Sequence, residues 1–271
     1  MVADNIPAMT IRVGVFGAGG RMGVAVCKAV AADPELELVA AVDPHHAGID
    51  LRQVAKVDAP DLQVAASADE FLRANVDVAV DFTVVDAARQ NLAYLAEHGI
   101  HAVVGTTGFT DEDYATFESV FVDSNCIVAP NFAIGAVLMM RFAEMAAPFF
   151  ESAEIIELHH DKKVDAPSGT AMMTVQRMAA ASADWAPDPT EKINLPGVRG
   201  GRGPGGIAVH SVRLRGVVSH QEVLLGTTGQ SLSIRHDSYD VSSFMPGILL
   251  AVKGIADVPG VTLGLEPLLG L

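Results

Sequence analysis

The segment that decides the fold is 11–32, which reads IRVGVFGAGGRMGVAVCKAVAA. Its first six residues are mostly apolar and β-branched, which predicts a buried strand that ends at a glycine. Residues 21–32 predict a helix, so the turn GAGGRMG at 17–23 joins a strand to a helix. Glycines allow the backbone to approach a diphosphate, and the helix N-terminus offers free N–H groups. The turn therefore predicts a dinucleotide site, although a glycine turn of this kind can also serve packing alone.

Strands and helices alternate downstream of this turn. A helix capped by Asp86 is expected to stop at Gly99, and Thr110 and Asp113 form a predicted capping pair for a helix near 111–121. This alternation predicts an α/β fold with a Rossmann-like doubly wound parallel sheet. The further predicted strands are 36–42, 76–82, 100–104 and 126–129, with a weaker one at 62–65.

The pattern changes after Asn131 and predicts an α+β region with a mixed, largely antiparallel sheet. Its last three strands are expected to be antiparallel because short turns join them. A final helix, 242–255, has an apolar face and is expected to return to the first domain. The other predicted elements are helices 134–149 and 169–182, a loop with six glycines at 197–206, and strands 153–160, 207–214, 217–226 and 230–236.

Charge and composition exclude several classes of partner. The net charge of −15 argues against nucleic acid. Between residues 192 and 220 there are five Lys or Arg and no acid, which fits either an anionic small molecule or a solvated loop. Two cysteines make no disulfide framework and indicate a reducing, cytoplasmic location. We find no secretory signal, and the most apolar stretch, 126–140, is too short to cross a membrane.

Asp43 ends the second predicted strand, 24 residues after Gly19. An acid at this place can accept hydrogen bonds from the adenosine ribose and would repel a 2′-phosphate. No arginine follows it, since the next residues are Pro44, His45 and His46. NADH is therefore the preferred cofactor and NADPH remains possible. Alternatively, Asp43 is a turn acid that caps the next segment.

Two further segments follow strands of the predicted parallel sheet. These are GTTG at 105–108 and APNF at 129–132. Ligands of doubly wound sheets bind beyond the carboxyl ends of the strands, so both segments are candidates for contact with nicotinamide and its ribose. Each segment can equally be an ordinary turn.

The segment ELHHDKKVDAPSGTA at 157–171 holds the candidate chemistry. His159 and His160 need a bend between them to serve one ligand, and no third metal ligand sits at a usual spacing, so no metal is expected. The turn 168–170 opens a helix and suits a carboxylate. Lys163 can neutralise an anion or donate a proton, and neighbouring cations would lower its pKa. Each part also has a plain interpretation, as surface histidines, a solvated lysine run and an ordinary helix start.

Together these residues resemble the 4-hydroxy-tetrahydrodipicolinate reductase family, long called dihydrodipicolinate reductase, of lysine and diaminopimelate biosynthesis. The resemblance covers nearly the whole chain. Its rivals are another NAD(P) oxidoreductase, such as an amino-acid or sugar dehydrogenase, and a nucleotide sensor without catalysis. The matching segments are 17–23, DFT at 81–83, 105–108, PNF at 130–132, 157–171 and 207–238.

The resemblance implies a dinucleotide-binding domain, 1–131 with 242–271, and a substrate-binding and oligomerisation domain, 132–241. It implies reduction of a small dicarboxylate, 4-hydroxy-tetrahydrodipicolinate, to tetrahydrodipicolinate with loss of water, by a homotetramer that uses NADH or NADPH. The family often has an arginine at the place of Pro44, so the cofactor preference stays open.

The resemblance also implies residue roles. His159 and Lys163 resemble the family's proton-transfer groups, and which of them gives the proton stays open. Substrate contacts are expected at His160, Lys163, Ser168, Gly169 and Thr170. Nucleotide contacts are expected at Gly17, Ala18, Gly19, Gly20, Arg21, Met22, Asp43, Gly105, Thr106, Thr107, Ala129, Pro130, Asn131 and Phe132.

Overall fold

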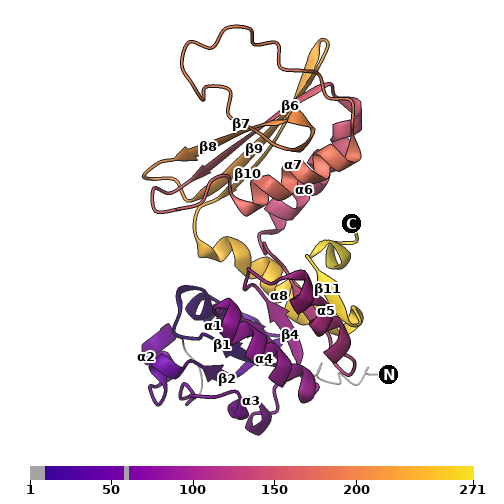
Figure 1. Ribbon diagram of the computed structural model, residues 1–271. Coiled ribbons are helices and arrows are strands. Elements are labelled where there is room, and N and C mark those ends of the chain that lie inside the picture. The colour runs from indigo at the N-terminus through magenta and orange to yellow at the C-terminus, as the bar shows by residue number, and fades with distance from the viewer. Residues whose placement is uncertain (1–9, 58–60) are drawn as a thin grey trace, which may run out of the picture. The chain divides into compact units, whose positions relative to one another are not determined.

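The computed structural model describes residues 10–57 and 61–271, and Figure 1 labels its helices and strands. The chain divides into two compact units. The first unit combines Met1–Phe132 with Phe244–Leu271, and the second unit is Ala133–Ser243. No helix among the described residues is both long and apolar enough to cross a membrane.

The first unit is built on a six-stranded sheet in which all neighbouring strands are parallel. The strand order is β11-β5-β4-β3-β1-β2. Since the strands run in one direction, the segments that follow them meet at one edge of the sheet. The strands are β1 (Ile11–Phe16), β2 (Leu36–Val42), β3 (Val78–Asp81), β4 (His101–Val104), β5 (Cys126–Val128) and β11 (Val261–Leu263). The helices are α1 (Arg21–Ala32), α2 (Leu51–Ala55), α3 (Asp69–Arg73), α4 (Val85–Glu97), α5 (Asp111–Val120) and α8 (Met245–Gly254).

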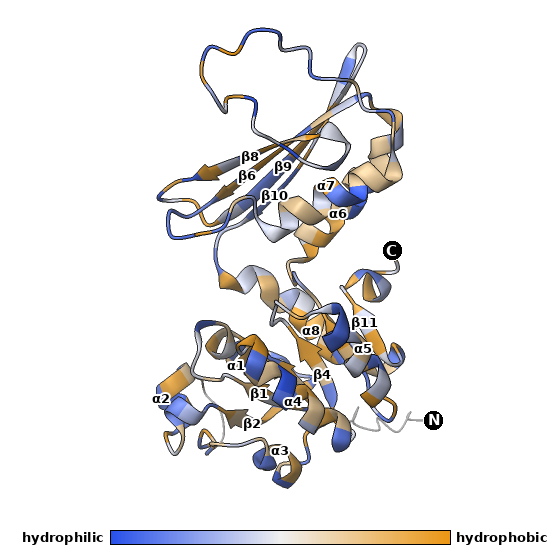
Figure 2. Ribbon diagram, viewed as in Figure 1, coloured by the Kyte–Doolittle hydropathy of each residue, from blue (hydrophilic) through white to orange (hydrophobic). Residues whose placement is uncertain are grey.

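Apolar strand residues form the core of the first unit. Val13 and Val15 of β1 are fully buried, as expected for a parallel strand covered on both faces. The Phe71 ring of α3 packs 4.5 Å from that of Phe16, centroid to centroid. Figure 2 shows β4 as predominantly hydrophobic. α8 packs against α1, so the helix near the C-terminus contributes to the same core.

The second unit is a five-stranded mixed sheet of order β10-β9-β6-β8-β7. Figure 1 shows α6 and α7 together on one face of this sheet. Thr174 of α7 accepts a hydrogen bond of 2.8 Å from Gln221 of β9, which ties the helix to the sheet. The strands are β6 (Ser152–His159), β7 (Gly201–Arg202), β8 (Ala208–Arg213), β9 (Ser219–Thr227) and β10 (Gln230–Ser238), and the helices are α6 (Ile134–Ala146) and α7 (Gly169–Ala181).

The predicted parallel sheet and the predicted mixed sheet are both present. β1 and β2 have the predicted ends. Thr110 and Asp113 form the predicted capping box at α5. Predicted helices 134–149 and 242–255 are shorter as α-helices, because a 3-10 turn replaces the last residues of the first and the first residues of the second.

Two local predictions are wrong. Segment 62–65 is not a strand and makes isolated bridges through Gln63 and Ala65. Asp86 lies in the first turn of α4, whose N-cap is Val84, so it favours the helix dipole without capping. The last three long strands, β8, β9 and β10, do run antiparallel in turn as predicted, although β6 lies between β8 and β9. The short strands β7 and β11 were not predicted.

Candidate active site

The glycine-rich turn after β1 closes on itself and leaves the start of α1 without a side-chain cap. Gly17 has a φ of +65°, which favours glycine, and its carbonyl accepts a 2.9 Å hydrogen bond from the Gly20 N–H. Gly20 is the N-cap of α1 and has no side chain to cap it. A Cβ on Gly23 would lie 2.0 Å from the Gly17 oxygen, so the helix can approach the turn only with glycine there. This is the cradle that a diphosphate needs.

Asp43 lies against this turn. Its Oδ2 accepts a 2.9 Å hydrogen bond from the Gly19 N–H, and its Oδ1 accepts one of 3.0 Å from the His45 N–H. His46 Nδ1 lies 3.3 Å from the same Oδ1. Burial would raise the pKa of Asp43, but the adjacent His46 imidazole and the hydrogen bonds from the Gly19 and His45 N–H groups outweigh it and hold this pKa below its usual value. Asp43 also caps the 3-10 helix Pro44–His46, so the alternative interpretation describes its present contacts.

His46 is a close neighbour of the turn that the sequence does not single out. A Cβ on Gly19 would lie 2.2 Å from His46 Nδ1, so the imidazole rests directly on the glycine backbone. The contact depends on the 3-10 helix that Asp43 caps, which turns the chain back over the glycines. Sequence spacing alone gives no signal for such a return.

A buried carboxyl group ties together the loops that follow β3 and β4. Asp81 is fully buried, and its Oδ1 accepts hydrogen bonds from Thr83 N–H (2.8 Å), Thr83 Oγ1 (2.7 Å) and Thr106 Oγ1 (3.1 Å). Its Oδ2 accepts one of 2.7 Å from the Asn91 side chain. The DFT and GTTG segments are therefore held in one arrangement.

Aromatic packing joins the loop after β5 to the same edge. A Cβ on Gly105 would lie 1.9 Å from the Phe82 ring, so the ring packs directly against the glycine backbone. The ring centroids of Phe82 and Phe132 are 5.6 Å apart. The structure thus brings the predicted segments 105–108 and 129–132 together, with Thr107 and Pro130 exposed.

His159 closes β6 at the start of the candidate chemical segment in the second unit. Its Nδ1 lies 2.5 Å from Oε2 of Glu157, and its Nε2 lies 3.0 Å from Oγ of Ser219. Arg213 donates to both oxygens of Glu157, at 3.0 and 2.9 Å. Sequence reasoning did not assign Glu157, Ser219 or Arg213. The period of two along a strand, which puts 157 and 159 on one face, is the signal that could have found Glu157.

β6 ends at His159, so His160 is the first residue after the strand. The His160 N–H donates to the Val218 carbonyl at 3.3 Å, beyond the last residue of β6. Lys163 Nζ donates to both oxygens of Asp165, at 2.8 and 2.9 Å. This hydrogen bond holds the pKa of Asp165 below its usual value. The hydrogen-bond partner of Lys163 is thus a carboxylate only two residues away.

The predicted anion-binding turn opens α7. Ser168 is the N-cap, and its buried hydroxyl accepts a 3.2 Å hydrogen bond from the Ala171 N–H. A Cβ on Gly169 would meet no atom within 4 Å. Within the described residues, no three His, Cys, Asp or Glu side chains are grouped as metal ligands would be.

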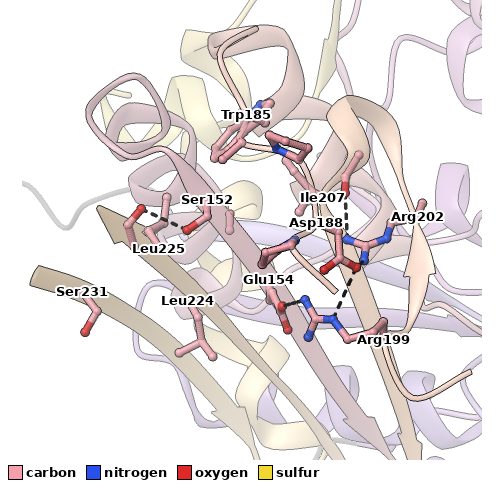
Figure 3. Close-up of a pocket in the computed structure, with 16 residues that line it drawn as sticks. Ser152, Glu154, Trp185, Asp188, Arg199, Arg202, Ile207, Leu224, Leu225 and Ser231 are labelled. Carbon is pink, nitrogen blue, oxygen red and sulfur yellow. Dashed lines mark hydrogen bonds and ion pairs between the residues drawn. The ribbon is translucent and has the colours of Figure 1, made fainter. Parts of the chain in front are cut away.

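A cavity of about 380 Å³ lies elsewhere in the second unit, at the other end of β6 (Figure 3). Its lining includes Glu154, Trp185 and two arginines, Arg199 and Arg202, that form ion pairs with carboxylates. Figure 3 shows Arg199 pointing toward Glu154 and Asp188. None of the predicted site residues lines this cavity.

Comparison with known proteins matches nearly the whole chain to one family. The family models described as dihydrodipicolinate reductase, N-terminus and C-terminus, match residues 11–132 and 135–269. A 4-hydroxy-tetrahydrodipicolinate reductase of Cutibacterium acnes is 51% identical over 268 residues, which is 96% of this chain and 99% of the relative. One of Nocardia farcinica is 50% identical and covers 97% of this chain and 100% of the relative.

Solved structures agree with these relatives. A dipicolinate-bound dihydrodipicolinate reductase from Paenisporosarcina sp. TG-14 is 39% identical, with a TM-score of 0.85 over 96% of this chain and 99% of that one. An amine dehydrogenase from Mycobacterium smegmatis, 13% identical with a TM-score of 0.65 over 94% and 95% of the two chains, shares the fold alone. The chain therefore belongs to the dihydrodipicolinate reductase family, and it is an oxidoreductase of lysine and diaminopimelate biosynthesis.

Proposed function

We propose that the chain reduces (2S,4S)-4-hydroxy-2,3,4,5-tetrahydrodipicolinate to (S)-2,3,4,5-tetrahydrodipicolinate with loss of water, and that it prefers NADH to NADPH. The family uses a pyridine nucleotide. The observation that carries the preference is the Asp43 carboxylate, whose lowered pKa keeps it charged and whose Oδ2 is bonded to the glycine turn. A charged carboxylate accepts ribose hydroxyls and repels a 2′-phosphate.

The residues present fit a dinucleotide. Residues 17–22 would hold the diphosphate, because the start of α1 has no side-chain cap. Asp43 would hold the adenosine ribose. Residues 105–107 and 129–132 would hold the nicotinamide half, at the carboxyl edge that Asp81 and Phe82 organise. The bound nicotinamide supplies the hydride.

The second unit would bind the dicarboxylate. We assign one substrate carboxylate to the turn 168–170 and to Lys163, with help from His160, because a helix N-terminus and an ammonium group both attract an anion. Lys163 already binds a carboxylate, Asp165, and a substrate carboxylate can take its place. In the family's reaction hydride goes to ring C4 and a proton goes to ring C3, and His159 and Lys163 are the two groups that would handle this proton.

Two further proposals concern assembly and location. Residues of β6 alternate, so Ile155 faces the helices while Ile156 and Leu158 lie on the other face and are only half-buried. This face supports association with other copies of the chain, as a homotetramer, which sedimentation velocity would test. The two cysteines, Cys27 and Cys126, are free and buried, which supports a cytoplasmic location.

A nucleotide-oxidation assay with synthase-generated substrate tests the cofactor preference. We expect kcat/KM to be at least about tenfold higher with NADH than with NADPH, equivalent to about 1.4 kcal/mol of discrimination. Asp43→Asn keeps an acceptor oxygen but removes the charge, so it should erase most of this ratio. Asp50→Asn is the matched control, because Asp50 also caps a short helix but lies outside the proposed contacts. Equal use of both nucleotides by the wild type would contradict the preference.

A further inference from the structure

The carboxylate of Glu157 is completely buried beside the proposed proton-transfer histidine. Glu157 has no exposed surface and lies two residues before His159 on the central strand β6. Burial alone would raise the pKa of Glu157, but hydrogen bonds from His159, Arg213 and Ser211 outweigh it and lower the pKa to about 2. The group is therefore a fixed negative charge inside the sheet.

This charge selects the tautomer of His159. A carboxylate accepts hydrogen bonds and cannot donate them, so Nδ1, 2.5 Å from Glu157 Oε2, must carry a proton and donate it. In neutral His159 the lone pair then lies on Nε2. Ser219 Oγ lies 3.0 Å from Nε2, and a hydroxyl can donate to the neutral ring or accept from the charged ring. Nε2 is thus the atom of His159 that can exchange a proton.

Arg213 fixes Glu157 and connects it to the Lys163 loop. Its two terminal nitrogens contact both Glu157 oxygens, which leaves Oε2 shared between Arg213 and His159. The same guanidinium donates to the Asp165 carbonyl at 2.6 Å. Asp165 is also the residue that pairs with Lys163. The buried glutamate is therefore linked through one arginine to the loop of the second proposed proton-transfer group.

We propose that Glu157 is a positioning residue for the reduction: it holds His159 as the Nδ1–H tautomer, so that Nε2 is presented for proton transfer. This inference rests on the proposed role of His159. It differs from a purely structural ion pair, because Glu157 acts on the one side chain of the network that is proposed to exchange a proton.

The chain offers a matched control on the same strand. Glu154 also contacts a histidine and an arginine, since its oxygens lie 2.9 Å from His210 Nε2 and 2.5 Å from Arg199. Glu154 lies three residues from Glu157 on the same strand, so its side chain points to the opposite face of the sheet, where it is partly exposed. Glu154→Gln removes the same charge from a Glu–His–Arg cluster without contact to His159.

Steady-state kinetics separates the two clusters. For Glu157→Gln we expect kcat to fall about 10- to 100-fold, the range for loss of a partner that orients a functional histidine, with substrate KM within about twofold. For Glu154→Gln we expect both constants to stay within about twofold. The double variant Glu157→Gln/His159→Asn should have the same kcat as His159→Asn alone, because the effect of Glu157 on kcat passes through the His159 imidazole.

Nitrogen-15 NMR of the neutral imidazole tests positioning without catalysis. In the wild type we expect the His159 proton on Nδ1. In Glu157→Gln, Arg213 should retain the amide oxygen, so the amide NH₂ should face Nδ1 and move the proton to Nε2. A proton on Nε2 in the wild-type enzyme would overturn the inference even if the variant does not fold.

The two proposals fail in different ways. Full kcat in His159→Asn would remove His159 from proton transfer, and the proposed function would need another group. A large loss in His159→Asn with wild-type kcat and tautomer in Glu157→Gln would overturn the positioning role alone.

Discussion

The two helices proposed to receive anions, α1 and α7, begin in different ways. α1 starts after Gly20 with no side-chain cap, and a Cβ on Gly23 would collide with the Gly17 oxygen at 2.0 Å. α7 starts after Ser168, whose hydroxyl caps it, and a Cβ on Gly169 would meet nothing within 4 Å.

The difference separates glycine required by the fold from glycine that the fold leaves free. At α1 the backbone of the turn itself demands glycine, whether or not a nucleotide is bound. At α7 no atom of the chain within 4 Å demands glycine, and the proposed substrate is the group that would come close to Gly169. The glycines before α1 are therefore explained by the fold, whereas Gly169 at α7 is explained by the proposed ligand.

The largest effect is expected at the α7 end, from Lys163→Ala. We expect kcat to fall at least about 100-fold, because both charge neutralisation and a proton source are lost. The dissociation constant of the nucleotide, measured by calorimetry, should not change. Lys162→Ala is the matched control, as an exposed lysine one position away. Retained turnover in Lys163→Ala would remove this residue from the proposed site.

Gly23→Ala tests the α1 end. The added Cβ would overlap backbone atoms that cannot rotate away, so we expect the free energy of unfolding to fall by about 3 kcal/mol. Denaturant unfolding of the first unit measures the loss. A variant as stable as the wild type would show that the turn can open, and the proposed contrast with α7 would disappear.

Ser168→Ala should remove a cap and an anion contact together. Loss of an N-cap hydroxyl costs about 1 kcal/mol of stability, and we expect substrate KM to rise as well. Thr110→Ala, which removes the cap of α5 in the first unit, should lower stability similarly with an unchanged KM. Equal KM values in both variants would reduce Ser168 to a structural cap.

The smallest effect on stability is expected for Gly169→Ala. The methyl group has open space, so the free energy of unfolding should stay within about 0.5 kcal/mol of the wild type. Substrate KM should nevertheless increase, because the methyl group lies where the ligand is proposed to approach. An unchanged KM would leave Gly169 without a role in binding.

The sequence predicts what local pattern determines. β1 and β2 are mostly apolar runs, and the Thr110–Asp113 box lies within four residues, so the sequence predicts both correctly. The place of β6 between β8 and β9 depends on pairing across more than 50 residues, which no turn signal encodes. β11 has only three residues, too few for a recognisable period.

The same distinction holds for the candidate site. His159, Lys163 and Ser168 stand in one segment, so their grouping could be recognised from the sequence. Arg213 reaches Glu157 from 56 residues away, and nothing near either residue indicates the other. The pairing of Lys163 with Asp165 is local, but the sequence does not say which neighbour a flexible ammonium group selects.

The buried Asp81 has a consequence for how a nucleotide would be received. The Thr106 hydroxyl, in the loop after β4, and Thr83, in the loop after β3, bind the same Asp81 oxygen, and the Asn91 side chain holds the other oxygen, so the two loops are tied together through one buried carboxylate. Such loops need little ordering when a ligand arrives, so less binding energy is lost to entropy. The proposed nicotinamide end of the first unit is in this sense preorganised by a carboxyl group that need not touch the ligand.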